Sequence, residues 1–87
     1  MYIHLGNNVM LPTDEIIGIF DLENTSISKR TRDFLNRAEK EGRIITISYD
    51  LPRSFVIAGK KKKNSKIYIS KISSSTLLKR TGYIDSL

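Results

Sequence analysis

The sequence predicts a small α+β domain, in which a mostly antiparallel sheet carries one main helix and a short helix near the carboxyl end. Two observations favour this class: short β-branched runs separated by turn-forming residues, and one long segment with helical periodicity. In chain order the expected elements are β-β-β-α-β-β-β-α. The chain has 87 residues, which is enough for a single domain, and we place that domain over residues 1–87.

Three strands are expected before the main helix. Residues 2–5 and 9–11 flank the segment Gly6 to Asn8, which tolerates positive φ and suits a tight hairpin. Residues 15–20 form the third strand, and they are apolar nearly throughout. We therefore expect this strand to be central or covered on both faces. Gly18, in its middle, indicates a bulge or a close backbone approach.

The main helix is predicted from Ser26 or Ser28 to Glu41. Serine is a common N-cap residue, and Gly42 stands where a glycine often ends a helix. One stripe of side chains at a spacing of three to four residues would face the sheet. Its members are Ile27, Thr31, Phe34, Leu35 and Ala38.

Three further strands and a short helix are predicted after the main helix. Residues 43–49 alternate in polarity and are rich in β-branched side chains, as is typical of a strand. Residues 53–58 and 66–70 flank a segment of turn formers, which indicates a second hairpin. The hydroxyl side chains of residues 73–76 can cap a last helix over residues 77–81.

The second hairpin concentrates positive charge in what we call the lysine tip. Its members are Lys60, Lys61, Lys62, Lys63 and Lys66. Like charges this close repel one another, and either solvation or an anionic partner relieves the repulsion. The formal net charge is +6 and the pI is about 9.8, which fits nucleic acid or an anionic membrane surface. We expect DNA or RNA as the partner, ahead of a membrane, an acidic protein or simple solubility.

Arginines supply the other predicted contacts. Arg53 stands in a turn beside Pro52, where a guanidinium held in place can pair bidentately with phosphate or guanine. Arg30 and Arg37 share one side of the main helix, which is either a nucleic-acid surface or a solvated face with ion pairs. The aromatic residues are scattered and form no evident stacking platform, which favours duplex over single-stranded nucleic acid.

The sequence offers little chemistry for catalysis or metal binding. It has no cysteine and one histidine, His4, which we expect at a surface or a sheet edge. The serines of residues 73–75 lack a His–Asp partner set, so helix capping explains them better than nucleophilic catalysis does. We expect no enzyme activity, no metal and no cofactor.

Nothing in the sequence predicts secretion or membrane insertion. The amino-terminal residues lack a basic region followed by an apolar run, and no apolar run approaches the ~20 residues that cross a bilayer. We expect a cytoplasmic protein associated with the nucleoid.

Several segments resemble the RemA/RemB group of regulators of extracellular matrix genes, and the RemB branch is the more similar. The segments are residues 3–6, 16–20, 38–42, 45–49 and 53–57, followed by Ser70 and Thr76. The resemblance implies a regulator of biofilm matrix genes that binds double-stranded DNA. It also implies ring-like homo-oligomers that present basic turns to the duplex. Self-association suits a small chain that has no disulfide to stabilise it.

The sequence departs from the RemA branch at two of the DNA contacts that the resemblance implies. Glu15 stands where that branch has an arginine, and Leu51 with Pro52 stands where it has an arginine pair. Either the DNA surface has moved toward Arg53 and the lysine tip, or the chain acts through another partner. The alternatives are a protein-interaction subunit that binds an acidic partner, and a small RNA-binding module.

Overall fold

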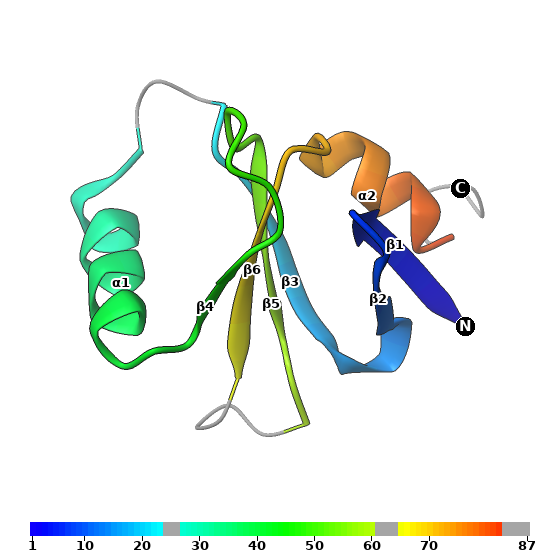
Figure 1. The fold of residues 1–87 in the computed structure, drawn as a ribbon, viewed down its shortest axis with the longest axis horizontal. Helices are drawn as coiled ribbons and strands as arrows, with labels where there is room; N and C mark the ends of the chain where they lie inside the picture. The colour runs from blue at the N-terminus through cyan, green and yellow to red at the C-terminus, as the bar shows by residue number, and fades with distance from the viewer. Residues whose placement is uncertain (24–26, 61–64, 83–87) are drawn as a thin grey trace.

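The computed structural model describes residues 1–23, 27–60 and 65–82, and its strands form two sheets (Figure 1). Strands β1 (Tyr2–Gly6) and β2 (Val9–Pro12) form an antiparallel hairpin, and a short 3-10 turn, η1 (Thr13–Glu15), follows. The later elements are β3 (Ile16–Asp21), α1 (Lys29–Lys40), β4 (Ile44–Thr46), β5 (Ser54–Ala58), β6 (Lys66–Ser70) and α2 (Ser74–Arg80). This order confirms the predicted α+β class.

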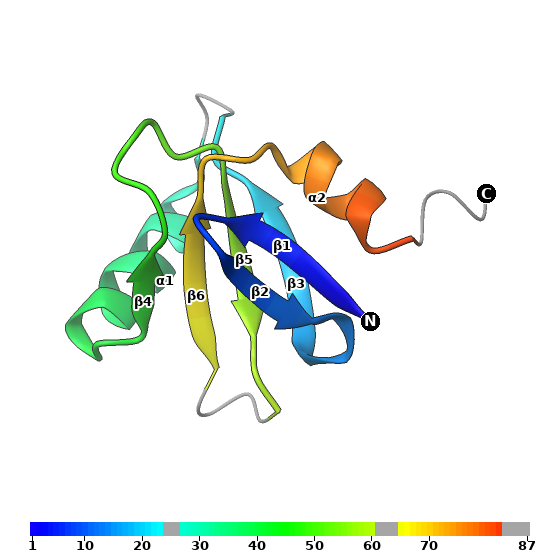
Figure 2. The ribbon, with the colours of Figure 1, turned by 45° about the vertical axis from the view of Figure 1, so that its right-hand side comes forward.

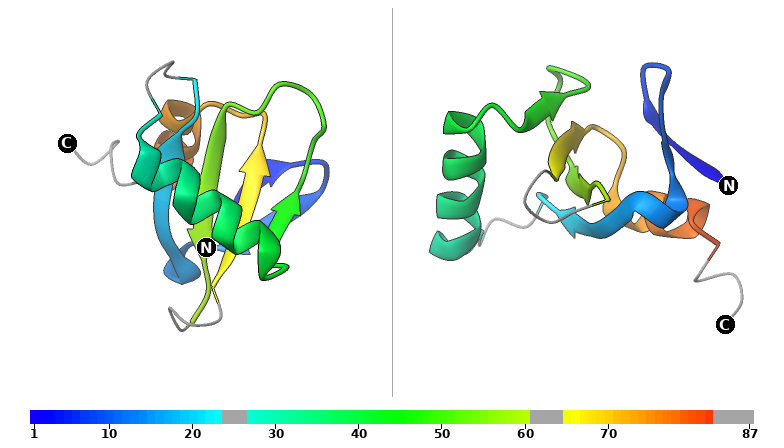
Figure 3. Two further views of the ribbon diagram at one scale, coloured as in Figure 1. Left: turned by 90° about the vertical axis from the view of Figure 1, so that its left-hand side faces the viewer. Right: turned by 90° about the horizontal axis from the view of Figure 1, so that it is seen from below.

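The four-stranded sheet has the order β3-β5-β6-β4, so β5 and β6 are its central strands. All of its pairs are antiparallel except β4 with β6, which run parallel. Helix α1 lies against one face and crosses from the β3 edge to the β4 edge (Figures 1 and 3). The β1–β2 hairpin and α2 lie on the opposite face (Figure 2). The sheet therefore forms the middle of three layers.

Alternating side chains of the central strands enter two apolar clusters, one on each face. The cluster on the α1 side contains Phe55, Ile57, Ile67 and Ile69, together with Phe34, Leu35 and Ala38 from the helix. The cluster on the other side contains Val56, Ala58 and Tyr68, together with Ile3, Leu5, Leu11 and Leu77. Of the predicted helix stripe, Phe34, Leu35 and Ala38 thus face the sheet, whereas Ile27 lies before the helix and is in neither cluster. Burial of this apolar surface on both faces is the main stabilising contribution.

Local signals in the sequence are confirmed at the first hairpin and at both ends of α1. Asn7 and Asn8 have φ values of 47° and 66°, the conformation of a tight turn between twisted strands. The side-chain oxygen of Ser28 accepts a hydrogen bond of 3.2 Å from the Thr31 backbone N–H, which is the predicted N-cap. Gly42 follows the helix with a φ of +71°.

The prediction that residues 15–20 form a central or doubly covered strand is wrong, because β3 is an edge strand. Ile17 and Phe20 point to the α1 side of the sheet beyond the part that the helix covers, and they are 47% and 43% exposed. The predicted irregularity at Gly18 is confirmed, since the register with β5 shifts between Ile16 and Gly18. A Cβ atom at Gly18 would lie 2.6 Å from the Phe20 ring, so the ring closely covers the glycine.

The predicted strand over residues 43–49 is too long, because β4 ends at Thr46. From there the chain has to pass over the end of β6 to reach β5, which lies on the far side of β6. The Ile47 backbone N–H donates a last bond of 3.0 Å to the Ile69 carbonyl, and the chain then leaves the sheet.

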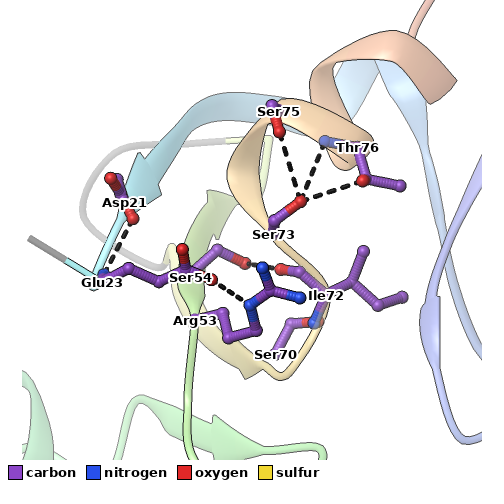
Figure 4. Close-up of polar contacts among 9 residues, drawn as sticks. All are labelled: Asp21, Glu23, Arg53, Ser54, Ser70, Ile72, Ser73, Ser75 and Thr76. Carbon is purple, nitrogen blue, oxygen red and sulfur yellow. Dashed lines mark hydrogen bonds and ion pairs between the residues drawn. The ribbon is translucent and has the colours of Figure 1, made fainter.

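Two serines that are fully buried attach the central strands to the neighbouring layer. The Ser70 hydroxyl donates to the Leu5 carbonyl at 2.8 Å and accepts a bond of 3.0 Å from the Ile72 N–H. The Ser54 hydroxyl donates to the Ile72 carbonyl at 2.7 Å. Both hydroxyls therefore have partners, as buried polar groups require, and they fix the start of the segment that leads to α2 (Figure 4).

We expect Ser70→Ala to lower the free energy of unfolding by about 1–3 kcal/mol, because the Leu5 carbonyl and the Ile72 N–H would lose a buried partner. Urea denaturation followed by circular dichroism measures this. Ser75→Ala, at an exposed position of α2, is the matched control and should change the value by less than about 0.5 kcal/mol. Equal effects of the two substitutions would contradict the role of the buried hydroxyl.

Candidate nucleic-acid interface

The predicted nucleic-acid contacts lie at opposite ends of the four-stranded sheet. Arg53 directly precedes β5, and Lys60 follows the strand at its other end (Figure 1). At ~3.4 Å per residue, the strand separates the two by roughly 20–25 Å. This is more than twice the distance, about 8 Å, over which exposed charges act in physiological salt. Within one chain the two groups therefore act as separate sites.

Arg53 is held in place by its backbone and by an acidic neighbour. Its N–H donates to the Ser70 carbonyl at 2.9 Å, and its carbonyl accepts a bond of 3.0 Å from the Leu22 N–H. Its guanidinium forms an ion pair with the Glu23 carboxylate (Figure 4). A phosphate group would have to compete with this carboxylate. The sequence alone did not indicate the pair, because the two residues are 30 positions apart.

The described members of the lysine tip are Lys60 and Lys66, and both are exposed. The antiparallel pairing of β5 with β6 confirms the predicted hairpin, and Lys66 lies opposite Ala58 at its base. Within the described ranges neither lysine forms an ion pair. Lys61, Lys62 and Lys63 lie outside the described residues. The hairpin base thus presents two positive charges that no described carboxylate neutralises.

Arg43 anchors the base of this hairpin, a role that the sequence analysis missed. Its Nη1 donates to the Ser65 carbonyl at 3.0 Å and to the Ser65 hydroxyl at 3.1 Å, and its Nε donates to the Glu41 carboxylate at 2.9 Å. The Arg43 side chain is only 19% exposed. A basic residue just after a helix-ending glycine carries no signal for this role, which depends on Ser65, 22 positions away in the sequence.

Arg30 and Arg37 are exposed on α1, two turns apart on the same side of the helix. Neither forms an ion pair with any described residue. Among the described residues, the same helix has an ion pair between neighbouring turns, in which the Lys29 Nζ lies 3.8 Å from the Asp33 Oδ2. This is an ion pair of the kind expected if the helix face is solvated. Both of these predicted contacts on α1 are thus cations without an ion-pair partner among the described residues.

The two departures from the RemA branch lie at opposite ends of the sheet. Glu15 ends η1, and its backbone carbonyl accepts a bond of 2.8 Å from the Gly59 N–H, beside the lysine hairpin. Leu51 and Pro52 are exposed in the loop between β4 and β5, next to Arg53. In the same loop the Asp50 carboxylate oxygen Oδ2 lies 3.8 Å from the Lys71 Nζ. The cations at this second end therefore have acidic neighbours.

The part of the chain that the structure describes contains no group of three histidine or carboxylate side chains arranged to hold a metal ion. His4 is exposed on β1, as expected for a surface residue. Among the same residues, no helix has the length and apolar character of a membrane span.

Comparison with known proteins identifies the family. The model of the RemA-like family, described as extracellular matrix regulatory protein A-like, matches residues 2–81. The chain belongs to this family. It is also 33% identical over 84 residues to extracellular matrix regulatory protein B of Bacillus subtilis (strain 168), an alignment that covers 97% of this chain and 94% of the relative. The resemblance seen in the sequence to the RemA/RemB group, and to its RemB branch, is therefore confirmed.

We expect Arg43→Ala to destabilise the protein by roughly 1–3 kcal/mol, because the substitution removes charge-assisted hydrogen bonds at the hairpin base. Thermal and urea unfolding measure the change. Arg37→Ala removes the same charge from an exposed helix position and should leave stability within about 0.5 kcal/mol of wild type. If both variants unfold like wild type, Arg43 is not an anchor.

Proposed function

We propose that this protein is a DNA-binding transcriptional regulator of extracellular matrix genes that acts as a homo-oligomer. The name of the Bacillus subtilis relative, extracellular matrix regulatory protein B, supports the regulatory role. The observation that carries the DNA-binding step is the pair of exposed lysines, Lys60 and Lys66, which frame a run of further lysines and form no ion pair with a described residue. A net charge of +6 supports a polyanionic partner.

The lysine tip is the proposed primary DNA contact, through phosphate groups. Lysine is a compact point charge on a flexible stem, so it supplies affinity with little reading of base sequence. One tip binds weakly. Several tips in one oligomer bind one duplex together, and the combined affinity exceeds that of a single copy by orders of magnitude.

The arginines take secondary roles in this proposal. Arg30 and Arg37 are exposed and unpaired among the described residues, so they can contact phosphates flanking the primary contact. Arg53 contacts DNA only when Glu23 releases it, because the ion pair already satisfies part of its guanidinium. The charge arrangement therefore favours the hairpin end of the sheet over the Arg53 end.

We expect replacement of Lys60, Lys61, Lys62 and Lys63 by glutamine to weaken binding to a promoter-length duplex and to flatten its salt dependence. The slope of log K against log salt should fall by about 0.9 for each phosphate group that the variant no longer neutralises. Fluorescence anisotropy across a salt series measures both quantities. A control variant with glutamine at Lys29, Arg32, Lys71 and Lys79 removes the same charge from other surfaces and should keep most of the slope. Equal reductions in the two variants would show that net charge, and not the tip, sets the affinity.

A second measurement tests the role of Glu23. We expect Arg53→Gln to change duplex affinity less than the tip variant does, because Arg53 is already paired. Glu23→Gln should raise the affinity several-fold by freeing the guanidinium, and adding Arg53→Gln should cancel that gain. A gain that persists in the double variant would mean that Arg53 is not the contacting group.

Two experiments distinguish the alternative functions from DNA binding. An acidic protein partner of the lysine tip remains bound to the purified protein after nuclease treatment, whereas partners held through nucleic acid dissociate. Structured RNA and duplex DNA at equal salt distinguish an RNA-binding module from a DNA regulator. The observation that favours a protein partner is the exposure of Tyr49 and Leu51, in the loop where the resemblance places the RemA-branch arginine pair.

A further inference from the structure

Helix α1 leaves a strip of the sheet face beside it uncovered, because it crosses the sheet diagonally from β3 to β4 (Figure 3, left). Two hollows lie in this strip. The first is lined by Phe20, Arg30, Thr31, Phe34, Phe55 and Ile57. The second is lined by Ile17, Phe34, Arg43, Ile57 and Ser65. Because Phe34 and Ile57 line both, the hollows adjoin, and we call them together the β3 trough.

The trough is long and narrow. The two hollows have volumes of about 250 Å³ and 230 Å³. Each alone is smaller than the cavities of about 300–1,000 Å³ that hold small-molecule ligands, and the two together fall within that range. Phe20 lines the first hollow and Ile17 the second, three residues apart along β3, which is roughly 10 Å at ~3.4 Å per residue. The shape therefore suits an elongated ligand better than a compact one.

The wall of the first hollow is shaped by stacked aromatic rings and by a glycine. The Phe20 and Phe55 ring centroids lie 4.8 Å apart, with an angle of 16° between the ring planes. A Cβ atom at Gly18 would lie 2.6 Å from the Phe20 ring, so only a glycine leaves room for the ring in this position. The irregular glycine of β3 thus allows Phe20 to lie along the strand and to present an apolar surface.

The two ends of the trough differ in charge. The Arg30 side chain, in the first hollow, is exposed and forms no ion pair with any described residue. Arg43, in the second hollow, is already paired with the Glu41 carboxylate at 2.9 Å and bonded to Ser65. The trough thus complements a molecule that has an anion at one end and an apolar body. A guanidinium pairs bidentately with a carboxylate, which favours that anion.

We propose that the β3 trough binds a free medium-chain fatty acid, with its carboxylate on Arg30 and its hydrocarbon chain extending past Phe34 toward Ile17. A flexible chain can follow the apolar surface from the first hollow into the second, which a single aromatic ring would leave empty. Each methylene group that the trough buries should raise the affinity about fourfold. The inference goes beyond the proposed function and does not depend on it, since binding is tested without DNA.

The first test asks whether Arg30 binds the carboxylate. Isothermal titration calorimetry with sodium decanoate, below its critical micelle concentration, should show saturable binding to the full chain, whereas decyltrimethylammonium, of opposite charge, should not bind. Arg30→Gln should weaken decanoate binding roughly tenfold. Arg32→Gln removes an exposed arginine of the same helix that lines neither hollow, and it should keep the wild-type affinity. Absence of decanoate binding, or equal losses in the two variants, overturns the proposal.

The second test uses chain length to find where the hydrocarbon chain lies. Affinity should rise from hexanoate to decanoate, as measured by ligand-detected NMR for the weaker binder. Ile17→Thr keeps a β-branched residue in β3 and should weaken decanoate binding several-fold, while hexanoate, which is too short to reach the second hollow, should bind as it does to wild type. Equal effects on the two acids overturn the proposed orientation.

Gly18→Ala tests the aromatic wall without changing a residue that lines the trough. The added Cβ meets the far end of the Phe20 side chain, so the ring has to turn away from Phe55 while the backbone stays in place. Circular dichroism checks that the variant folds, and its affinity for decanoate should fall several-fold. An unchanged affinity in the folded variant overturns the placement of the chain on this wall.

A last experiment distinguishes the free acid from a lipid surface. Co-sedimentation with phosphatidylglycerol vesicles measures binding to an anionic membrane. Free decanoate that binds with the Arg30 dependence described above supports the proposal. Vesicles that bind through Arg30 while free decanoate does not bind overturn it in favour of a membrane.

Discussion

The rest of the structure depends on β5, a central strand whose two faces are both buried. Ser54, Val56 and Ala58 point to the hairpin layer, Phe55 points to the helix layer, and all four are at most 3% exposed. A strand of this kind is stable only if each face has a cover. The β1–β2 hairpin and α2 cover one face and α1 covers the other, so the three-layer arrangement follows from the need to bury this strand on both faces.

Eighty-seven residues are enough to cover the central strands but not the edges. Helix α1 contributes Phe34, Leu35 and Ala38 to the sheet, and the apolar side chains of β3 extend beyond the surface that it covers. What a larger domain would bury with another helix, this chain leaves exposed, namely Ile17 and Phe20 on β3 and Tyr49 and Leu51 in the loop after β4. The small number of residues is thus the physical reason that these side chains stay exposed.

The basic residues follow a different constraint from the apolar ones. Near the β4–β5 loop, Arg53 and Lys71 both have carboxylate partners, whereas Lys60 and Lys66 at the other end have none among the described residues. The described cations that have no carboxylate partner therefore lie at the hairpin end of the sheet and on the two helices. This division leaves lysines without an ion pair at one end of the sheet and exposed apolar side chains, Tyr49 and Leu51, at the other.

The sequence by itself determined the features that depend on residues close together in the chain. The turn at Asn7 and Asn8, the Ser28 cap and the irregularity at Gly18 each follow from the conformational preference of one or two residues. Only the tertiary structure decided that β3 lies at an edge, that β4 stops at Thr46, and that Glu23 neutralises Arg53. These outcomes depend on strand order and on contacts between residues that are distant in the sequence. The sequence of an apolar or basic run does not reveal which distant segment it will contact. The candidate site was therefore predictable as a set of cations but not as a surface, because folding decides which charges remain unpaired.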